Sequence, residues 1–109
     1  MSVDRGNLFD DAAAPGGGER CDVLLRHRNL VVERIVSSAA MEPKSFVQAQ
    51  DEWVVLLRGT AVLEVAGERL VLATGDYVFL PAGTAHTVCS ASEGALWLAV
   101  KSGSESHYA

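Results

Sequence analysis

Residues 75–86 read Gly-Asp-Tyr-Val-Phe-Leu-Pro-Ala-Gly-Thr-Ala-His, a short apolar run between turn-forming residues. The Gly-Asp pair favours a tight turn, and the next four residues are aromatic or aliphatic strand formers. The proline cannot donate to a strand ladder, so the strand is expected to end there. After a second turn, the histidine begins another extended segment. The stretch therefore predicts two strands joined by a turn, with His86 at the start of the second strand.

The same alternation of β-branched or aliphatic runs with turn residues continues along the chain. No segment of about twelve or more residues shows a helical hydrophobic period. Regularly spaced short strands are typical of sandwiches and barrels. We therefore predict an all-β fold, a small antiparallel β-barrel of jelly-roll type. The expected strands are residues 22–27, 30–37, 46–48, 53–58, 60–65, 68–72, 77–80, 86–90 and 95–100.

Three turns carry specific expectations. Arg58-Gly59 and Ala66-Gly67 are expected to be tight reversals that close antiparallel hairpins. Asp76 is expected to accept hydrogen bonds from backbone N–H groups of its own turn.

The chain of 109 residues, 49% of them hydrophobic, fits a single domain. Residues 12–18 read Ala-Ala-Ala-Pro-Gly-Gly-Gly, and the glycines disfavour an ordered helix there. We expect a flexible N-terminal arm and loop over residues 1–20, a barrel domain over residues 21–101, and a frayed tail over residues 102–109 that exposes His107. Leu8 and Phe9 precede the loop and can dock on the barrel as an arm.

Charge and composition exclude several classes of partner. A net charge of −5 without a basic stripe argues against nucleic acid and anionic membranes as partners, which leaves small molecules. The longest strongly apolar run, residues 53–57, is too short to span a bilayer, and the N-terminus lacks the apolar stretch of a secretion signal. We therefore expect a cytoplasmic protein in which Cys21 and Cys89, which form no CxxC pair, are reduced thiols.

One spacing resembles a known family. Gly75, Pro81, Gly83 and His86 are separated by five, one and two residues, and this pattern is similar to the second motif of the cupin family. In that family the histidine points into a small β-barrel and usually holds a metal, so the resemblance implies this position for His86. The asparagine that the family often has four residues later is Ser90 here.

The first cupin motif is matched only in its second half. It contains two histidines, then a glutamate and, after six residues, a glycine, and Glu52 and Gly59 fit the last two positions. The shorter family spacing places Phe46 and Gln48 at the histidine positions, and the longer one places Ser45 and Val47 there. The resemblance covers residues 31–100 but lacks two of the four usual metal ligands.

This ligand deficit shapes the expected site. Transition-metal sites gain most of their affinity from imidazoles and carboxylates. The resemblance leaves Glu52 and His86, with Gln48 as a third donor, so our hypothesis is a weak site for a divalent metal ion at these three residues. Gln50 or Asp51 could contribute if the loop shifts its register.

The barrel interior is expected to form a pocket. Trp97 is expected in the core, and Cys89, out of phase with His86, should face away from the cavity. His27, between two arginines, is expected on an exposed face. The side chains expected to line the pocket are Phe46, Gln48, Val54, Leu56 and His86.

Residues 53–57 are apolar on both faces of their strand. Either the strand is buried wholly within its own sandwich, or a partner chain covers its second face. The tendency of small cupins to form dimers favours a homodimer.

Two classes of function follow. The first is a module that binds a small molecule in the barrel, oriented by Glu52 and His86. The alternative is a metal-dependent enzyme of isomerase or oxygenase type, acting on a small organic acid or sugar-like substrate with His86 and Glu52 as its catalytic candidates. A purely structural dimeric partner of another protein is a third possibility.

Overall fold

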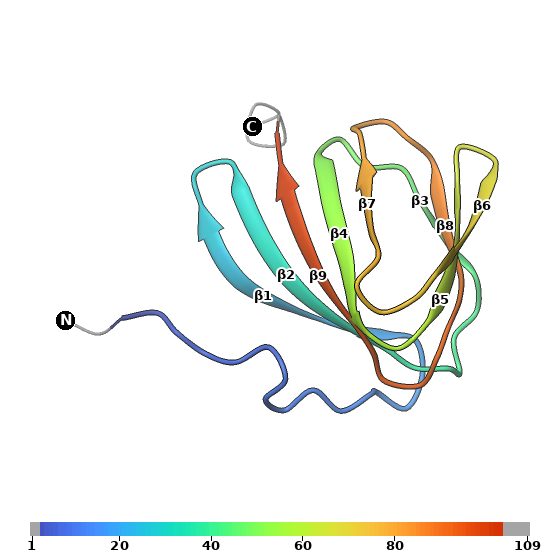
Figure 1. Ribbon diagram of the computed structural model, residues 1–109. Coiled ribbons are helices and arrows are strands. Elements are labelled where there is room, and N and C mark those ends of the chain that lie inside the picture. The colour runs from blue at the N-terminus through green and yellow to red at the C-terminus, as the bar shows by residue number, and fades with distance from the viewer. Residues whose placement is uncertain (1–2, 104–109) are drawn as a thin grey trace.

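A computed structural model describes residues 3–103 of the chain. These residues form nine strands and no helix, as the all-β prediction requires (Figure 1). His107 lies outside the described residues. The strands are β1 (Glu19–His27), β2 (Leu30–Ser37), β3 (Lys44–Phe46), β4 (Asp51–Arg58), β5 (Ala61–Val65), β6 (Glu68–Leu72), β7 (Tyr77–Leu80), β8 (His86–Ala91) and β9 (Ala95–Ser102).

The strands are arranged in two sheets. Five strands pair in the order β1-β2-β9-β4-β7, and four pair in the order β3-β8-β5-β6. Every pairing is antiparallel. The hydrophobic core joins Leu56 and Trp97 of the first sheet to Leu63 and Val88 of the second, so the two sheets face each other. This arrangement confirms the predicted cupin-type jelly roll. No helix among residues 3–103 is long and apolar enough to cross a membrane.

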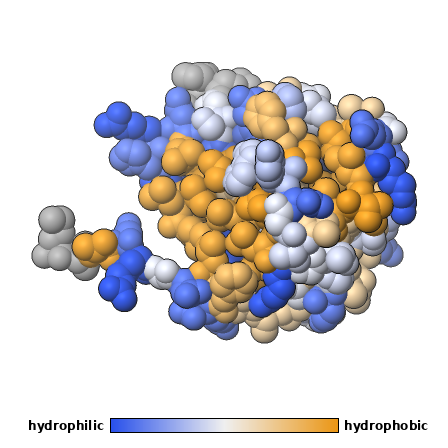
Figure 2. All heavy atoms as spheres, in the orientation of Figure 1, coloured by the Kyte–Doolittle hydropathy of each residue, from blue (hydrophilic) through white to orange (hydrophobic). Residues whose placement is uncertain are grey.

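Alternation along the strands of the five-stranded sheet creates an inner and an outer face. In β4, Glu52, Val54 and Leu56 are buried on the inner face, whereas Trp53 and the two apolar residues in phase with it are only half-buried on the outer face. Figure 2 shows a broad hydrophobic area over this sheet. β4 therefore carries apolar residues on both faces. The described residues bury the inner face fully and the outer face only in part.

The N-terminal arm is held against the five-stranded sheet by arginines. The Arg34 guanidinium donates to the backbone oxygens of Leu8 and Asp10, at 3.0 and 2.6 Å. Arg58 Nη2 donates to the oxygen of Ala12 at 2.9 Å, and Ala12 is itself buried. The expected boundary at residue 20 falls inside β1, because the strand begins at Glu19 and pairs with β2 from that residue.

Two of the three turns behave as expected. Ala66 and Gly67 both have a positive φ, 50° and 84°, and close the β5–β6 hairpin. Asp76 Oδ2 accepts a hydrogen bond from the backbone N–H of Ala73 at 2.8 Å.

The hairpin expected at Arg58-Gly59 is wrong. The turn carries the chain from β4 in one sheet to β5 in the other, and these strands do not pair. Gly59 has a φ of 92°, and a Cβ there would lie 2.5 Å from Ser92 Oγ. Ser92 Oγ also accepts the backbone N–H of Thr60 at 2.9 Å. The positive φ and the tight packing of two turns together favour glycine at this position, without a hairpin.

Candidate functional site

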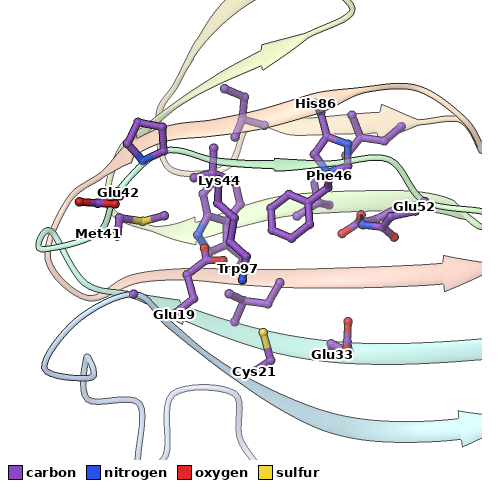
Figure 3. Close-up of a pocket in the computed structure, with 18 of the residues that line it drawn as sticks. Glu19, Cys21, Glu33, Met41, Glu42, Lys44, Phe46, Glu52, His86 and Trp97 are labelled. Carbon is purple, nitrogen blue, oxygen red and sulfur yellow. Dashed lines mark hydrogen bonds between the residues drawn. The ribbon is translucent and has the colours of Figure 1, made fainter.

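A cavity of about 620 Å³ lies between the two sheets (Figure 3). Part of its wall is apolar and comprises Ile35, Val54, Leu63, Leu80, Val88 and Trp97, with Met41 and Phe46. The polar and ionisable side chains in the wall are Glu19, Cys21, Glu33, Glu42, Lys44, Gln48, Glu52, His86 and Lys101. Figure 3 shows that these groups come from both sheets and from the loop before β3.

His86 lies on the inner face at the start of β8 and is buried. It pairs with Phe46 of β3 across the two strands, which explains why the two rings stack with centroids 5.4 Å apart and planes 20° apart. Its Nδ1 lies 3.4 Å from the backbone oxygen of Thr84. One face of the imidazole is thus covered by a phenyl ring.

The strand that carries Phe46 differs from the expected one. β3 covers Lys44–Phe46 rather than residues 46–48. The chain leaves the sheet after Phe46, and the backbone oxygen of Gln48 accepts the N–H of Gly83 at 2.7 Å. This contact ties the segment before β4 to the turn before His86, so the two motifs meet at one end of the cavity.

Glu52 and Gln48 form a hydrogen-bonded pair in the cavity wall. Glu52 is only 6% exposed, and its Oε1 accepts a hydrogen bond from Gln48 Nε2 at 2.9 Å. Because an ionised carboxylate only accepts hydrogen bonds, this contact fixes the orientation of the amide. The Gln48 Oε1 atom is then buried with no hydrogen-bond partner among the described residues. Gln48 Oε1 can therefore accept a hydrogen bond, but no group among residues 3–103 donates one to it.

An ion pair between Lys101 and Glu33, which the sequence analysis does not predict, also lines the cavity. Lys101 Nζ lies 2.7 Å from Glu33 Oε1, and the two side chains are 20% and 16% exposed. Lys101 is also the cross-strand partner of Glu52. Burial lowers the pKa of Lys101, but the hydrogen bond and the charge of Glu33, followed by the charge of Glu52, outweigh it, so the pKa lies above its ordinary value. The ammonium group stays charged inside the protein.

A signal for this residue exists in the sequence. Lys101 lies four residues after Trp97 along β9, so the two residues are in phase and share the inner face. Its partner Glu33 lies two residues before Ile35 on β2, also in phase with the inner face. Charged side chains are mostly solvated, and the phase of two residues on different strands does not show that they pair, so the sequence alone does not predict this ion pair.

Trp97 is buried as predicted, and it also reaches the cavity. Its Nε1–H donates to Ser37 Oγ at 3.0 Å, and the Ser37 hydroxyl in turn donates to Glu19 Oε2 at 2.9 Å. This relay satisfies the indole and holds Glu19 at the cavity wall.

The two cysteines occupy different positions. Both are free thiols, and Cys89 is not part of the cavity wall, as its phase relative to His86 predicts. Cys21 does line the cavity. Its pKa is raised, first by partial burial and then by the charges of Glu19 and Glu33, which disfavours the thiolate. Cys21 is therefore a poor nucleophile at neutral pH.

The structure places four of the five expected pocket residues in the wall: Phe46, Gln48, Val54 and His86. The expectation for Leu56 is wrong. Leu56 is on the same face as Val54, but it lies one step deeper, is fully buried in the core and does not reach the cavity. Asp51, the alternative donor, instead accepts the backbone N–H of Ala82 through Oδ1 at 2.9 Å.

These residues do not fit a firmly held transition metal. Across residues 3–103, no group of three or more His, Cys, Asp or Glu side chains is placed to hold a metal ion. Phe46 occupies a histidine position of the family motif and stacks on His86. Gln48 offers only a neutral amide, which is a weak ligand for a transition metal. One imidazole and one carboxylate make a weak site for a transition metal.

Comparison with known proteins identifies the family. The Cupin domain family matches residues 34–101, which is more than half of the chain, so the protein belongs to the cupin family. An uncharacterised protein of Streptomyces coelicolor is 35% identical over 82 residues, which cover 75% of this chain and 78% of that protein.

Solved structures show the same fold. A candidate mannose-6-phosphate isomerase from Ralstonia eutropha JMP134 superposes with a TM-score of 0.80 and 31% identity, covering 92% of this chain and 98% of that one. An RmlC-like cupin protein from Desulfovibrio desulfuricans has a TM-score of 0.79 at 14% identity, covering 93% and 97% of the two chains. At the latter identity the similarity concerns the fold alone.

Proposed function

We propose that this cupin binds a small organic molecule in the cavity between its sheets. The observation that supports this most is the cavity itself, about 620 Å³ in volume, with an apolar wall and a few converging polar groups. Ligand pockets of soluble proteins have this size and make-up. The apolar wall around Trp97 would contact the hydrocarbon part of the ligand, and Gln48, Glu52 and His86 would orient its polar part.

A thermal-shift panel of small carboxylates, sugars and amines tests this proposal, because a ligand that binds only the folded state raises Tm. A bound compound should stabilise the wild type and the variant Gln50→Met, but stabilise Gln48→Met less. Gln48 lines the cavity and Gln50 does not, so equal loss in both variants would place the ligand elsewhere. A panel without any stabilising compound would contradict the proposal.

The weak divalent metal site at Gln48, Glu52 and His86 stays a prediction. Metal analysis of protein purified without a histidine tag tests it directly. The matched comparison is the double variant F46H/Q48H, which restores both histidines of the family motif and should gain metal affinity. Stoichiometric metal in the wild type that is lost in His86→Ala would establish the site; no retained metal in the wild type would remove it.

A second candidate function is proton transfer on a sugar-like substrate. It is favoured by the 31% identity to a protein described as a candidate mannose-6-phosphate isomerase, and by a carboxylate and an imidazole, Glu52 and His86, in one cavity. Incubation with mannose 6-phosphate in D₂O should then place deuterium on the substrate with the wild type and not with Glu52→Gln. Absence of exchange with the wild type would exclude this reaction for that substrate.

We also propose that a second copy of the chain covers the outer face of β4 and β7, giving a homodimer in the cytoplasm. Tyr77 and Phe79 are 66% and 56% exposed there, and the Tyr77 ring lies 5.6 Å from that of Trp53. Exposed apolar patches of this kind mark interaction surfaces. Light scattering should report a dimer that Phe79→Lys dissociates and Val71→Lys, on β6 of the other sheet, does not. A monomeric wild type would contradict the dimer.

A further inference from the structure

The charges in the cavity wall do not balance. Four carboxylates line the cavity, from Glu19, Glu33, Glu42 and Glu52, against the two ammonium groups of Lys44 and Lys101. The wall thus carries two more negative than positive charges before His86 is counted. In a partly closed cavity such an excess acts strongly on a charged ligand, since the effective dielectric is lower than that of water.

The two ammonium groups already have partners. Lys101 is paired with Glu33 at 2.7 Å. Lys44 Nζ lies 5.5 Å from the centre of the Phe46 ring, a cation–π contact. An anionic ligand would therefore have to compete for both cations while it approached four carboxylates.

The acceptors, by contrast, have unused capacity. Glu52 is almost fully buried, and the hydrogen bond recorded at its carboxylate engages only Oε1. Gln48 Oε1, beside it, is buried without a hydrogen-bond partner among residues 3–103. Leaving a buried acceptor without a donor costs about 1–3 kcal/mol. A group that donates both to Gln48 Oε1 and to the Glu52 carboxylate must carry more than one donor hydrogen and tolerate a neighbouring negative charge.

An ammonium group meets both requirements, because it carries three donors and no acceptor. Its hydrogen bonds to a carboxylate are charge-assisted and stronger than those of a neutral hydroxyl. A phosphate or carboxylate offers only acceptors and would face acceptors at Gln48 and Glu52. The apolar wall at Val54 and Trp97 leaves room for a hydrocarbon part next to the charged group.

We infer that the ligand of this cavity is a small organic amine, with its ammonium group between Gln48 Oε1 and the Glu52 carboxylate and its hydrocarbon part against Trp97. This inference rests on the proposed small-molecule function and names the chemical class of the ligand. An amine ligand would distinguish this chain from any relative whose substrate is a sugar phosphate.

The two tryptophans of the chain allow a direct test. Trp97 lines the cavity and Trp53 lies on the opposite face of the same sheet, so their indole N–H resonances report on the cavity and on the outside. The probes are 3-phenylpropylamine, 3-phenylpropanol, 3-phenylpropionate and mannose 6-phosphate. The amine should shift the Trp97 signal, leave the Trp53 signal in place, and bind about tenfold or more tightly than either anion, as one charge-assisted hydrogen bond implies.

Variants locate the ammonium group. Glu52→Gln keeps the shape of the side chain and should weaken binding of 3-phenylpropylamine about tenfold or more, and Gln48→Met should weaken it as well. The control Glu64→Gln removes the same charge from an exposed position outside the cavity and should leave the affinity unchanged. An unshifted Trp53 signal in each variant shows that the fold is retained.

The outcomes separate binding of an amine from binding of small molecules in general. If 3-phenylpropionate or mannose 6-phosphate shifts Trp97 at equal or lower concentration than the amine, the amine assignment is wrong and small-molecule binding stands. Equal weakening in Glu52→Gln and Glu64→Gln would also overturn the assignment, since a remote charge would then matter as much. If none of the four probes shifts Trp97, the amine assignment fails, and the thermal-shift panel decides separately on small-molecule binding.

Discussion

The two faces of β4 differ in burial and in one charged residue over the same eight residues. The inner face combines Glu52 with Val54 and Leu56, and its polar end meets the ion pair of Glu33 and Lys101. The outer face carries only apolar residues between Asp51 and Arg58 and remains half-exposed. Proteins usually bury apolar residues and solvate charged ones. At this end of the sheet a charged residue is buried and aromatic residues are exposed, as expected for a cavity on one side and a contact surface on the other.

The outer face is itself divided. At one end Ala12 of the N-terminal arm packs on Val36 and Leu96, and Leu57 lies against this cluster. At the other end Trp53 and the exposed aromatic residues of β7 have no such cover from the described residues. The arm therefore supplies the second layer for only part of the sheet.

Adjacent leucines of β4 test the difference between the faces with the same substitution. Leu56→Ala should lower the free energy of unfolding by about 3 to 5 kcal/mol, because it opens a cavity in a closed core. Leu57→Ala, on the half-buried outer face, should cost about 1 kcal/mol, since less apolar area is lost. Urea unfolding at low protein concentration measures both values. Equal losses would mean that the outer face is as closely packed as the core.

The inner ion pair should contribute a smaller amount. Lys101→Met leaves Glu33 and Glu52 without their cation and should cost about 2 kcal/mol at pH 7. Because the pKa of Lys101 is raised in the folded protein, its stabilisation is complete below the unfolded lysine pKa of about 10.4 and is lost as the pH rises through the higher folded-state value.

Unfolding experiments at pH 7 and at about pH 11 and above should therefore show the gap between wild type and Lys101→Met closing at high pH. Lys44→Met is the matched control, because Lys44 lines the same cavity but is exposed. It should cost less and show no such dependence. A gap that stays constant with pH would mean that Lys101 stabilises the protein through packing of its hydrocarbon chain.

The smallest effect concerns the ion pair between Asp22 and Arg34, the arginine that also donates to the arm. A hydrogen bond from Arg34 is the main cause of the lowered pKa of Asp22, with the charges of Arg20 and Arg34 in support against burial, which raises it. The stabilisation is therefore present above the ordinary carboxyl pKa of about 3.9 and is lost as the pH falls through the lower folded-state value.

Asp22→Asn should flatten the decline of Tm below about pH 4 by a modest amount, because the Asp22 side chain is 35% exposed. Asp4→Asn, an exposed residue of the arm, should leave the profile unchanged. Identical profiles for wild type and Asp22→Asn would show that the pair with Arg34 contributes nothing measurable.

Much of the fold followed from local patterns. The strand after Gly75, the β5–β6 hairpin at Ala66-Gly67 and the cap at Asp76 all depend on residues close in the chain. The turn at Gly59 was misjudged because glycine with a positive φ suits a hairpin and a crossing between sheets equally well. What separates the two is the distant contact with Ser92.

The site divides in the same way. Motif spacing and alternation predict the wall positions of Phe46, Gln48, Val54 and His86. Leu56 has the same phase along β4 as Val54, but it is fully buried in the core instead of lining the cavity. Depth along a strand depends on where the opposing sheet closes, and alternation alone carries no information about it.

The sequence by itself determined that this chain is a cupin with an incomplete first motif, because strand period, turn residues and motif spacing are local properties. Only the tertiary structure decided that Lys101 lies across from Glu52 and pairs with Glu33, and that His86 lines a cavity with excess negative charge and an unsatisfied amide oxygen. The physical reason is that burial and charge pairing depend on residues brought together by sheet closure, far apart along the chain.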